Sequence, residues 1–597
     1  MNLLEKTIAS ITVPDRMLSD AVRNALTERT SMDFGRLEDA LLRYIRITGE
    51  RHPAPVQTSV VISCADHGVA AESVSAYPPE TTLNMMCNYL IARGGAANAV
   101  TNYADAALIV ADLGVNADTA NIPELLHDSI AHGTKNMTVG AAMTCAQAIR
   151  AVETGIAIAN ERADCGDRCI LPGEMGISNT TASAAIVAAL LKLSPEEVTG
   201  RGANISDARL AHKIEIVRRA LAVNAPDPND GLDVLAKVGG FELGCIAGLI
   251  LGAAARRVLV VLDGANTTSA ALIAHALAPD CVHYLLASHA SLTEHSQPHA
   301  LRHLGLSPML RLDIRLSEAV GSSIALRMLM QMIEVWASVD AAADPPLTSR
   351  KMRFPSPADG YSDPTGGAFS TPNRTAMDAC RYRLDNLAKP IHSLGCLERI
   401  AVQLAGITGC ERPPLKTDAA LLLITQEEEL PLDLTRILAA LTAGRGISVR
   451  ILSVSNTDEC ILGAACTAAY TLARKHSLFI LGTCETKGNA MISAALKEAL
   501  HGAATGSCLV LPGDAVTDSI AHDCENTNAA IVPYILHVLP DMLTIDTGLS
   551  AGIAGIFGLD IIRAALHIVN DMKTFTDTGV AVAIDGAGAG RQIRERA

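Results

Sequence analysis

The sequence predicts an α/β protein with a three-layer fold, in which a mainly parallel sheet is flanked by helices, and it predicts that this unit is duplicated in tandem. Three observations support the prediction. Short apolar runs alternate with helical patterns, small aliphatic residues dominate the composition, and motifs of the first half recur in the second. With 597 residues, the chain is long enough for two large domains.

The predicted strands are short, continuous apolar runs, as expected for strands that are buried on both faces. Thr58–Ser63, Ala107–Ala111 and Val258–Leu262 have this character, and each ends at a polar or glycine-containing turn. Helical patterns such as Ala142–Glu161 and Ser183–Leu193 lie between them. This alternation predicts a parallel sheet with helices on both faces. Ligands in such folds bind at the carboxyl ends of the strands.

The composition limits both the core and the partners. Apolar residues make up 49% of the chain and aromatic residues only 3%, so small aliphatic side chains must fill the core. Lys and Arg total 48 against 63 Asp and Glu, which gives a net charge of -15. An acidic surface with few aromatic residues argues against nucleic acid as a partner. It leaves room for a local basic pocket that binds one phosphate.

The spacing of the cysteines and the length of the apolar segments indicate the cellular compartment of the protein. The 15 cysteines are irregularly spaced, and the pair Cys165 and Cys169 has no second pair to complete a zinc site. Met1–Arg16 does not resemble a secretory signal, and the longest apolar helix candidate, Leu243–Ala255, is too short to span a bilayer. We therefore expect a cytoplasmic protein with reduced thiols and no membrane contact.

The duplication is predicted from four pairs of matching segments that occur in the same order in both halves. The pairs are Phe34–Glu38 with Leu394–Glu398, Val139–Thr144 with Leu462–Thr467, Asn179 and Ser183–Ala185 with Asn489 and Ser493–Ala495, and Met309–Ser317 with Met542–Ser550. The spacing between partners shrinks along the chain, so the second copy is a shortened version of the first. Any single match could arise by chance, whereas four collinear matches indicate a common origin.

The two copies are separated by a segment with neither a helical nor a strand pattern. Ala341–Asn373 concentrates Pro, Gly, Ser and Asp, which is typical of a linker. We therefore predict a first domain over residues 1–340, a linker over 341–376 and a second, degenerate domain over 377–597.

The clearest candidate for a ligand site is Leu171–Thr181, which leads into a predicted helix. Gly173 and Gly176 allow close approach of the backbone, and the Asn-Thr-Thr turn that follows supplies hydroxyl groups at the start of the helix. Free N–H groups and the helix dipole favour an anion there, which suits a single phosphate. An ordinary capped helix explains the same residues equally well.

Other polar groups stand out in apolar surroundings, and each also has an ordinary structural explanation. The turn Ala65–Val69 and the segment Asp263–Thr268 each follow a predicted strand, and Lys237–Glu242 has paired glycines before a carboxylate. Lys213 on a helix is usually a solvated charge. Glu318 precedes an apolar helix, where it could simply stabilise the helix N-terminus. In a dry crevice its pKa would rise and it could serve as a base near neutral pH.

Several of these strings occur together in one order: DHGV, VSAYP, MTVGAAMT, GEMGISNTT, KVGGFE, LDG and RLSEAVG. In this respect the chain resembles the nicotinate-nucleotide–dimethylbenzimidazole phosphoribosyltransferase family, from about residue 15 to 337. The second half resembles the same family more weakly, chiefly through Lys389-Pro390, Ser393-Leu-Gly395 and the ending Asp571–Val580.

The resemblance implies that the chain transfers the phosphoribosyl group of nicotinate mononucleotide to an aromatic base, with no metal or cofactor. It implies a general base, a phosphate site, a nucleotide site, a nicotinate end and an aromatic-base pocket. The matching residues are Glu318 as base, Gly176, Asn179, Thr180, Thr181 and Lys213 for phosphate, Glu174 and Asp263 for the nucleotide, Ser291 for nicotinate, and Met175 and Leu316 for the acceptor base.

Departures from the family pattern leave the acceptor open. Asn84 stands where the family usually has a Gln near the acceptor base, and Glu318 is followed by Ala319 and Val320 in place of smaller residues. Two alternatives therefore remain. Related paired-subunit enzymes attach phenolic lower ligands, and a non-catalytic protein could bind the nucleotide without turnover.

The second copy lacks the predicted base, because Ala551 aligns with Glu318. We therefore predict a catalytically dead copy that packs on the first half as an intramolecular dimer partner. The competing interpretation is a second site for a different ligand, built from Lys487, Asp514 and Asp546.

Overall fold

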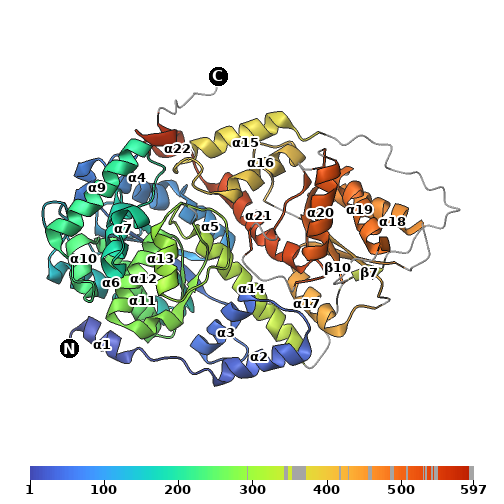
Figure 1. Cartoon of the computed structure of the whole chain (residues 1–597), viewed down its shortest axis with the longest axis horizontal. Helices are drawn as coiled ribbons and strands as arrows, with labels where there is room; N and C mark the ends of the chain where they lie inside the picture. The colour runs from blue at the N-terminus through green and yellow to red at the C-terminus, as the bar shows by residue number, and fades with distance from the viewer. Residues whose placement is uncertain are drawn as a thin grey trace.

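We describe the protein from a computed structural model (Figure 1). The structure describes residues 1–291, 293–341, 347, 349–351, 371–415, 418–427, 429–454, 460–484, 490–505, 508–528, 530–531, 534–538, 542–543 and 549–589.

The first half contains a six-stranded, entirely parallel sheet with the order β3-β2-β1-β4-β5-β6. Its strands are β1 (Thr58–Ala65), β2 (Ala107–Gly114), β3 (Leu125–His127), β4 (Cys169–Met175), β5 (Leu259–Leu262) and β6 (Leu285–Ala287). All three apolar runs predicted as strands are therefore confirmed. The order reverses at β1 and β4, so the crevice expected in such sheets opens above the carboxyl ends of these two strands.

Helices cover both faces of this sheet and form the remainder of the first half. They are α1 (Leu3–Ser10), α2 (Met17–Arg29), α3 (Arg36–Thr48), α4 (Thr81–Cys87), α5 (Ala96–Ala104), α6 (Cys145–Asp164), α7 (Asn179–Leu191), α8 (Pro195–Val198), α9 (Asp207–Asn224), α10 (Gly231–Val238), α11 (Phe241–Ala255), α12 (Ala265–Leu277), α13 (Ser296–His303) and α14 (Val320–Asp340). Small residues permit the closest packing. A side chain at Gly155 of α6 would meet the carbonyl of Cys245 on α11.

The second half contains a five-stranded parallel sheet with the order β11-β10-β8-β9-β7. Its strands are β7 (Ser349–Lys351), β8 (Ala419–Thr425), β9 (Ile447–Ser453), β10 (Leu478–Thr483) and β11 (Leu509–Pro512). Its helices are α15 (Arg374–Asn386), α16 (Cys396–Thr408), α17 (Leu432–Thr442), α18 (Cys460–Ala473), α19 (Ala490–Thr505), α20 (Ala515–Thr527), α21 (Ile553–Asp571) and α22 (Phe575–Thr578).

The two sheets share one topology, which fits the tandem duplication. In sheet order, β9, β8, β10 and β11 take the places of β2, β1, β4 and β5. The entries into the matching helices α3 and α16 also agree, since Gly35 and Gly395 precede them with φ of 50° and 55°. The edge strand differs. β7 reaches the position of β3 from the segment predicted as linker, so the expectation of no regular structure there is wrong for Ser349–Lys351.

The two halves are joined by a continuous hydrophobic core. Helix α21 of the second half packs on α5 of the first, and α14 packs on α17. Backbone hydrogen bonds cross the boundary, from the Arg315 N–H to the Ser393 carbonyl and from the Lys573 N–H to the Gly94 carbonyl. A second core cluster lies entirely within the second half.

Helix α21 corrects the expectation that Leu243–Ala255 is the longest apolar helix. Ile553–Asp571 has 19 residues and is the one helix among those described that is long and apolar enough to cross a membrane. It is 83% buried inside the protein, because it packs between the two halves. This is the environment of a core helix.

Candidate active site

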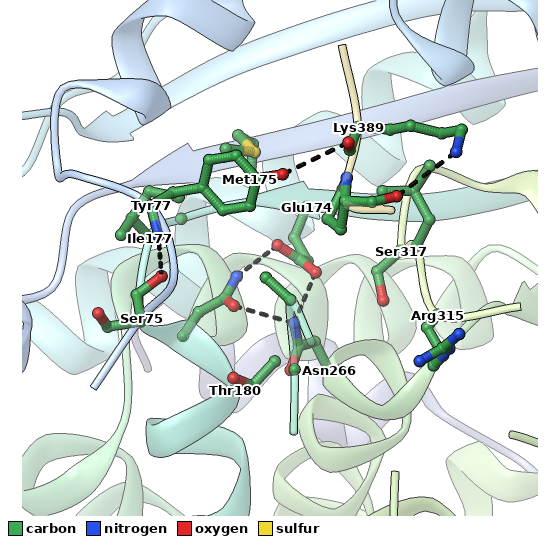
Figure 2. Close-up of a pocket in the computed structure, with 18 of the residues that line it drawn as sticks. Ser75, Tyr77, Glu174, Met175, Ile177, Thr180, Asn266, Arg315, Ser317 and Lys389 are labelled. Atoms are coloured by element: carbon green, nitrogen blue, oxygen red, sulfur yellow. Dashed lines mark hydrogen bonds between the residues drawn. The ribbon is translucent and has the colours of Figure 1, made fainter. Parts of the chain in front are cut away.

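A cavity lies at the carboxyl end of β4, beneath loops of the first half and against segments of the second (Figure 2). The first half contributes residues from α4, β4, α7 and α9 and from the loops that precede α9, α12 and α14. The second half contributes Ala388, Lys389, Pro390, Phe575 and Val580. In the view of Figure 2, Tyr77, Met175 and Lys389 lie at one side, Thr180 lies at the opposite side, and Glu174 and Asn266 lie between them.

Glu318 lines the cavity and is only 3% exposed. Burial raises the pKa of its carboxyl group to about 7, although hydrogen bonds from the backbone at the start of α5 oppose the rise. One of these is donated by the Ala97 N–H at 3.1 Å. The next residue, Ala319, has a φ of 61° and precedes α14, so the turn holds Glu318 at some cost in backbone strain. The result is a carboxylate that can accept a proton near neutral pH.

Glu174 is the second buried carboxyl group in the cavity. Its oxygens accept hydrogen bonds from the side-chain amides of Asn179 and, at 2.6 Å, Asn266. The side-chain amide of Asn266 also donates to the side-chain oxygen Oδ1 of Asn179 at 3.1 Å. Burial raises the pKa of Glu174 to about 8 despite these bonds. The network fixes a hydrogen-bonding group on the floor of the cavity, at the end of β4.

A buried cation lies at the helix N-terminus that the sequence predicted as a phosphate site. Lys213 on α9 is 1% exposed, and its ammonium group donates to Thr180 Oγ1 at 2.8 Å and to the Gly200 carbonyl at 3.1 Å. Burial lowers its pKa to about 8, while Glu294 opposes this. Gly202, with φ of 51°, lies so close that an added Cβ would meet Thr180 Oγ1 at 2.7 Å. This end of the cavity suits a small anion.

The second half closes the opposite end of the cavity. The Tyr77 hydroxyl donates to the Lys389 carbonyl at 3.4 Å. The Lys389 ammonium group binds Glu398 at 2.7 Å, and its side chain is fully buried. Lys389 and His392 hold the pKa of Glu398 at about 2 although burial would raise it. This ion pair fixes the segment that carries the cavity wall, and Phe575 adds an aromatic side chain to that wall.

Comparisons with known proteins identify the family to which the chain belongs. A family model described as "Phosphoribosyltransferase" matches residues 11–344 and 369–426. The nicotinate-nucleotide–dimethylbenzimidazole phosphoribosyltransferase of Chloroflexus aggregans is 43% identical over 354 residues, which cover 59% of this chain and 99% of the relative. That of Roseiflexus sp. is 45% identical and covers 55% of this chain and 92% of the relative.

This chain belongs to the nicotinate-nucleotide–dimethylbenzimidazole phosphoribosyltransferase family. A crystal structure of such an enzyme from Thermus thermophilus is 38% identical, with a TM-score of 0.50, and covers 54% of this chain and 96% of that chain. The relatives thus account for the first half over nearly their whole length. The second match of the family model, at 369–426, fits a second copy.

Most of the residues predicted from the sequence lie together in this phosphoribosyltransferase cavity. The predicted residues that line it are Glu174, Met175, Gly176, Asn179, Thr180, Lys213, Ser291, Leu316 and Glu318. The ordinary interpretation of Lys213 as a solvated charge is wrong, since burial and the contact with Thr180 place it at the helix start. The sequence could not show this, because the lysine and its partner lie on different helices.

Three predicted residues lie outside the lining. Asn84 on α4 does not line the cavity, although Thr81 and Met85 of the same helix do. Thr181 is fully buried within α7 and is not among the residues that line the cavity. Asp263 is buried behind the cavity and accepts a hydrogen bond from the Ser322 N–H at 2.9 Å. Asp263 therefore fixes the start of α14, close to Glu318, and does not itself contact the cavity.

The sequence analysis missed several lining residues. Asn266, Glu294, Tyr77, Lys389 and Phe575 all line the cavity. The sequence did contain a signal for Lys389 and Phe575, because both lie in strings that carry the family resemblance of the second half, Lys389-Pro390 and the ending Asp571–Val580. Their contribution to the first half's cavity depends on how the halves pack.

The DHGV turn makes a buried contact with Glu242 and does not line the cavity that holds Glu318. His67 Nε2 lies 2.7 Å from Glu242 Oε1, and both side chains are buried. A side chain at Gly240 would collide with the His67 ring. The KVGGFE and DHGV motifs are therefore parts of one contact beneath the sheet edge, and the paired glycines make room for it.

The equivalent position in the second half carries neither carboxylate. Thr483 is the sixth residue of β10, as Glu174 is of β4, and Ala551 lies two residues before α21, as Glu318 does before α14. The Ala551 N–H donates to the Thr483 carbonyl at 2.8 Å. Asp514 accepts N–H groups from Thr483 and Thr517 at 2.8 and 2.9 Å. Lys487 and Asp546, the other members of the alternative second site, lie outside the described residues.

Proposed function

We propose that this protein transfers the phosphoribosyl group of nicotinate mononucleotide to 5,6-dimethylbenzimidazole or an analogous aromatic base, which yields an α-ribazole phosphate and nicotinate for cobamide synthesis. The observation that carries the proposal is one cavity lined both by Glu318 and by the buried Lys213 with its hydrogen-bond partner Thr180. The names of relatives at 43% and 45% identity support the same activity.

The reaction follows from the chemistry of the donor. The nicotinate ring of the donor carries a cationic nitrogen, which becomes neutral when the ring leaves, while the anomeric carbon becomes oxocarbenium-like. The acceptor nitrogen attacks from the opposite face and inverts the configuration. Glu318 takes the proton that the acceptor loses, a step worth about 10²–10⁴-fold in rate. Its pKa of about 7 suits that role.

Lys213, Thr180 and the start of α7 anchor the 5′-phosphate in this proposal. An anion that accepts from Lys213 gains a charge-assisted hydrogen bond in a buried site. Its binding energy positions the ribose between Glu174 and Glu318, and orientation of this kind lowers the barrier without direct participation. The Asn179 and Asn266 amides hold Glu174 where it can accept a ribose hydroxyl.

The second half serves as a built-in dimer partner in this proposal. Its segments at 388–390 and 575–580 supply part of the wall on the side of Tyr77 and Met175, where an apolar acceptor ring fits. Because the partner is covalently attached, the shared cavity does not depend on protein concentration. The second copy has Thr483 and Ala551 in place of the two carboxylates, so we expect one active site per chain.

We further propose that the enzyme acts in the cytoplasm. In the part of the chain that the structure describes, no disulfide joins the cysteines, which suits a reducing compartment.

The proposal is tested by incubating the purified full chain with nicotinate mononucleotide and a panel of benzimidazoles, purines and phenols, with products identified by mass. We expect a ribosyl phosphate adduct of at least one benzimidazole. Adducts of phenols alone would assign the protein to the phenolic branch. Nucleotide binding without any product would favour the non-catalytic alternative.

The number of sites is tested by titration calorimetry with nicotinate mononucleotide. We expect one binding site per chain. Two sites, or unchanged activity and stability of residues 1–340 expressed alone, would contradict the role assigned to the second half.

A further inference from the structure

Four side chains with metal-binding chemistry converge in the second half, outside the catalytic cavity. Asp518, His522 and Glu525 are spaced by four and three residues along α20, so they share one face of the helix. His537 comes from the segment that follows α20. That segment lies beside the sheet, because Ile535 forms a parallel bridge with Val510 of β11.

Three of these residues, Asp518, His522 and His537, offer donor atoms within reach of a single ion. His537 Nδ1 is 2.7 Å from Asp518 Oδ1, and its Nε2 is 3.1 Å from Glu525 Oε2. His522 Nε2 is 3.7 Å from Asp518 Oδ2. Ligands bonded to one tetrahedral ion at about 2.0–2.1 Å are themselves about 3.3 Å apart. Asp518, His522 and His537 can each offer one donor atom within 4.8 Å of the others.

The charges in this cluster are unbalanced without a cation. The two carboxylates carry two negative charges, and the imidazole rings of His522 and His537 stack with their centroids 3.9 Å apart and their planes 4° apart. Protonation of both rings would bring two positive charges face to face, whereas protonation of one leaves a net negative charge. A divalent ion balances the two carboxylates while both imidazoles remain neutral, which is the form that binds metals.

We propose that Asp518, His522 and His537 form a binding site for a divalent transition ion of the zinc, cobalt and nickel group, with Glu525 accepting a hydrogen bond from the other ring nitrogen of His537. Two imidazole nitrogens favour these ions over Mg²⁺ and Ca²⁺, which prefer oxygen ligands alone. His537, Asp518 and Glu525 are 11%, 11% and 18% exposed, so most of the site is pre-formed. The His522 ring is 53% exposed and turns out of the stack to aim one nitrogen at the ion.

The site has a structural role. An ion bound by Asp518, His522 and His537 joins α20 to the segment around His537, which borders the outer strand of the second sheet. None of the four residues lines the catalytic cavity. Metal binding therefore stabilises the second half and does not take part in phosphoribosyl transfer.

The test uses the full, untagged chain freed of metal by a chelator and titrated with Zn²⁺ by calorimetry and with Co²⁺ by visible absorption. We expect one ion per chain, d–d bands of a tetrahedral Co²⁺ site with nitrogen and oxygen ligands, and a higher melting temperature with Zn²⁺. His537→Ala and Asp518→Asn should each weaken Co²⁺ binding at least tenfold. Asp518→Asn preserves the side-chain volume, so it reports on the site even if the histidine variant unfolds.

The matched control is His392→Asn. His392 belongs to another group of histidine and carboxylates, with Asp385 and Glu398, but Glu398 already binds Lys389 at 2.7 Å. His392 has φ of 56°, which asparagine tolerates. This variant should keep full Co²⁺ binding. Absence of binding, preference for Ca²⁺, or loss of binding in His392→Asn but not in the other variants would each overturn the proposal.

Discussion

The carboxyl ends of the two sheets differ although the sheets share one strand order. Above β4 in the first half, Glu174 and Glu318 line a cavity. Above β10 in the second, the backbone of Ala551 bonds to Thr483, and a side chain at Gly482 would collide with the N–H of Gly552. The segment before the last long helix contacts the end of the strand in both halves, since the Glu174 N–H also donates to the Ser317 carbonyl at 3.0 Å. The difference between the described residues is therefore the loss of the two carboxylates. A duplicated fold thus keeps its backbone packing while one copy loses the two acidic side chains of the site.

The largest expected effect comes from the carboxylate that only the first half retains. Glu318→Gln keeps the shape but cannot accept a proton, so kcat should fall by at least about 10²-fold with nearly unchanged binding of nicotinate mononucleotide. Steady-state kinetics and calorimetry would measure the two quantities.

The matched control in the second half is Asp514→Asn. Burial raises the pKa of Asp514 to about 6, and it accepts backbone N–H groups at the end of β10. This change should lower the melting temperature and leave kcat unaltered. Equal losses of kcat in both variants would remove the distinction between the copy that keeps the two carboxylates and the copy that has lost them.

The next effect concerns the phosphate end. Lys213→Ala removes a charged hydrogen-bond donor worth about 1.5–3 kcal/mol. Binding of nicotinate mononucleotide should weaken about 10–100-fold, while nicotinate riboside, which lacks the phosphate, should be affected little. Calorimetry with both ligands measures this difference. Equal losses for the two would show that Lys213 supports the fold and does not bind phosphate.

The dependence of kcat/KM on pH should form a bell. Glu318 acts in its deprotonated form, so activity falls as the pH drops below its raised pKa of about 7. Lys213 acts in its protonated form, so activity also falls as the pH rises above its lowered pKa of about 8. Each limb should approach about tenfold per pH unit. Lys213→Arg keeps its charge and should remove the alkaline limb, and an unchanged alkaline limb would assign it to another group.

The smallest expected effect concerns the segment of the second half that lines the cavity. Phe575→Leu shortens a side chain of the cavity wall while keeping it apolar. The KM for the acceptor base should rise about tenfold, with the KM for nicotinate mononucleotide unchanged. Parallel changes in both values would mean that Phe575 acts through stability and does not contact the acceptor.

The local elements were predictable because they depend on short-range patterns. The apolar runs of β1, β2 and β5 and the glycine-flanked start of α7 are visible in the sequence, and so are the repeated motifs. Glu318 was identified through the RLSEAVG string, and the structure agrees that it is buried beside the cavity. Its surroundings were not predictable, since the N–H of Ala97 comes from a helix more than two hundred residues away in sequence.

The sequence by itself determined the fold class, the duplication, the family and most of the residues around the cavity, because these are recorded in periodicity and in contiguous motifs. Tertiary structure alone decided that Lys213 reaches Thr180, that Asn84 and Asp263 lie off the cavity, and that Lys389 and Phe575 of the second half complete its wall. The physical reason is that burial, ion pairing and pKa arise from groups brought together across the chain. No local pattern records which helix faces which.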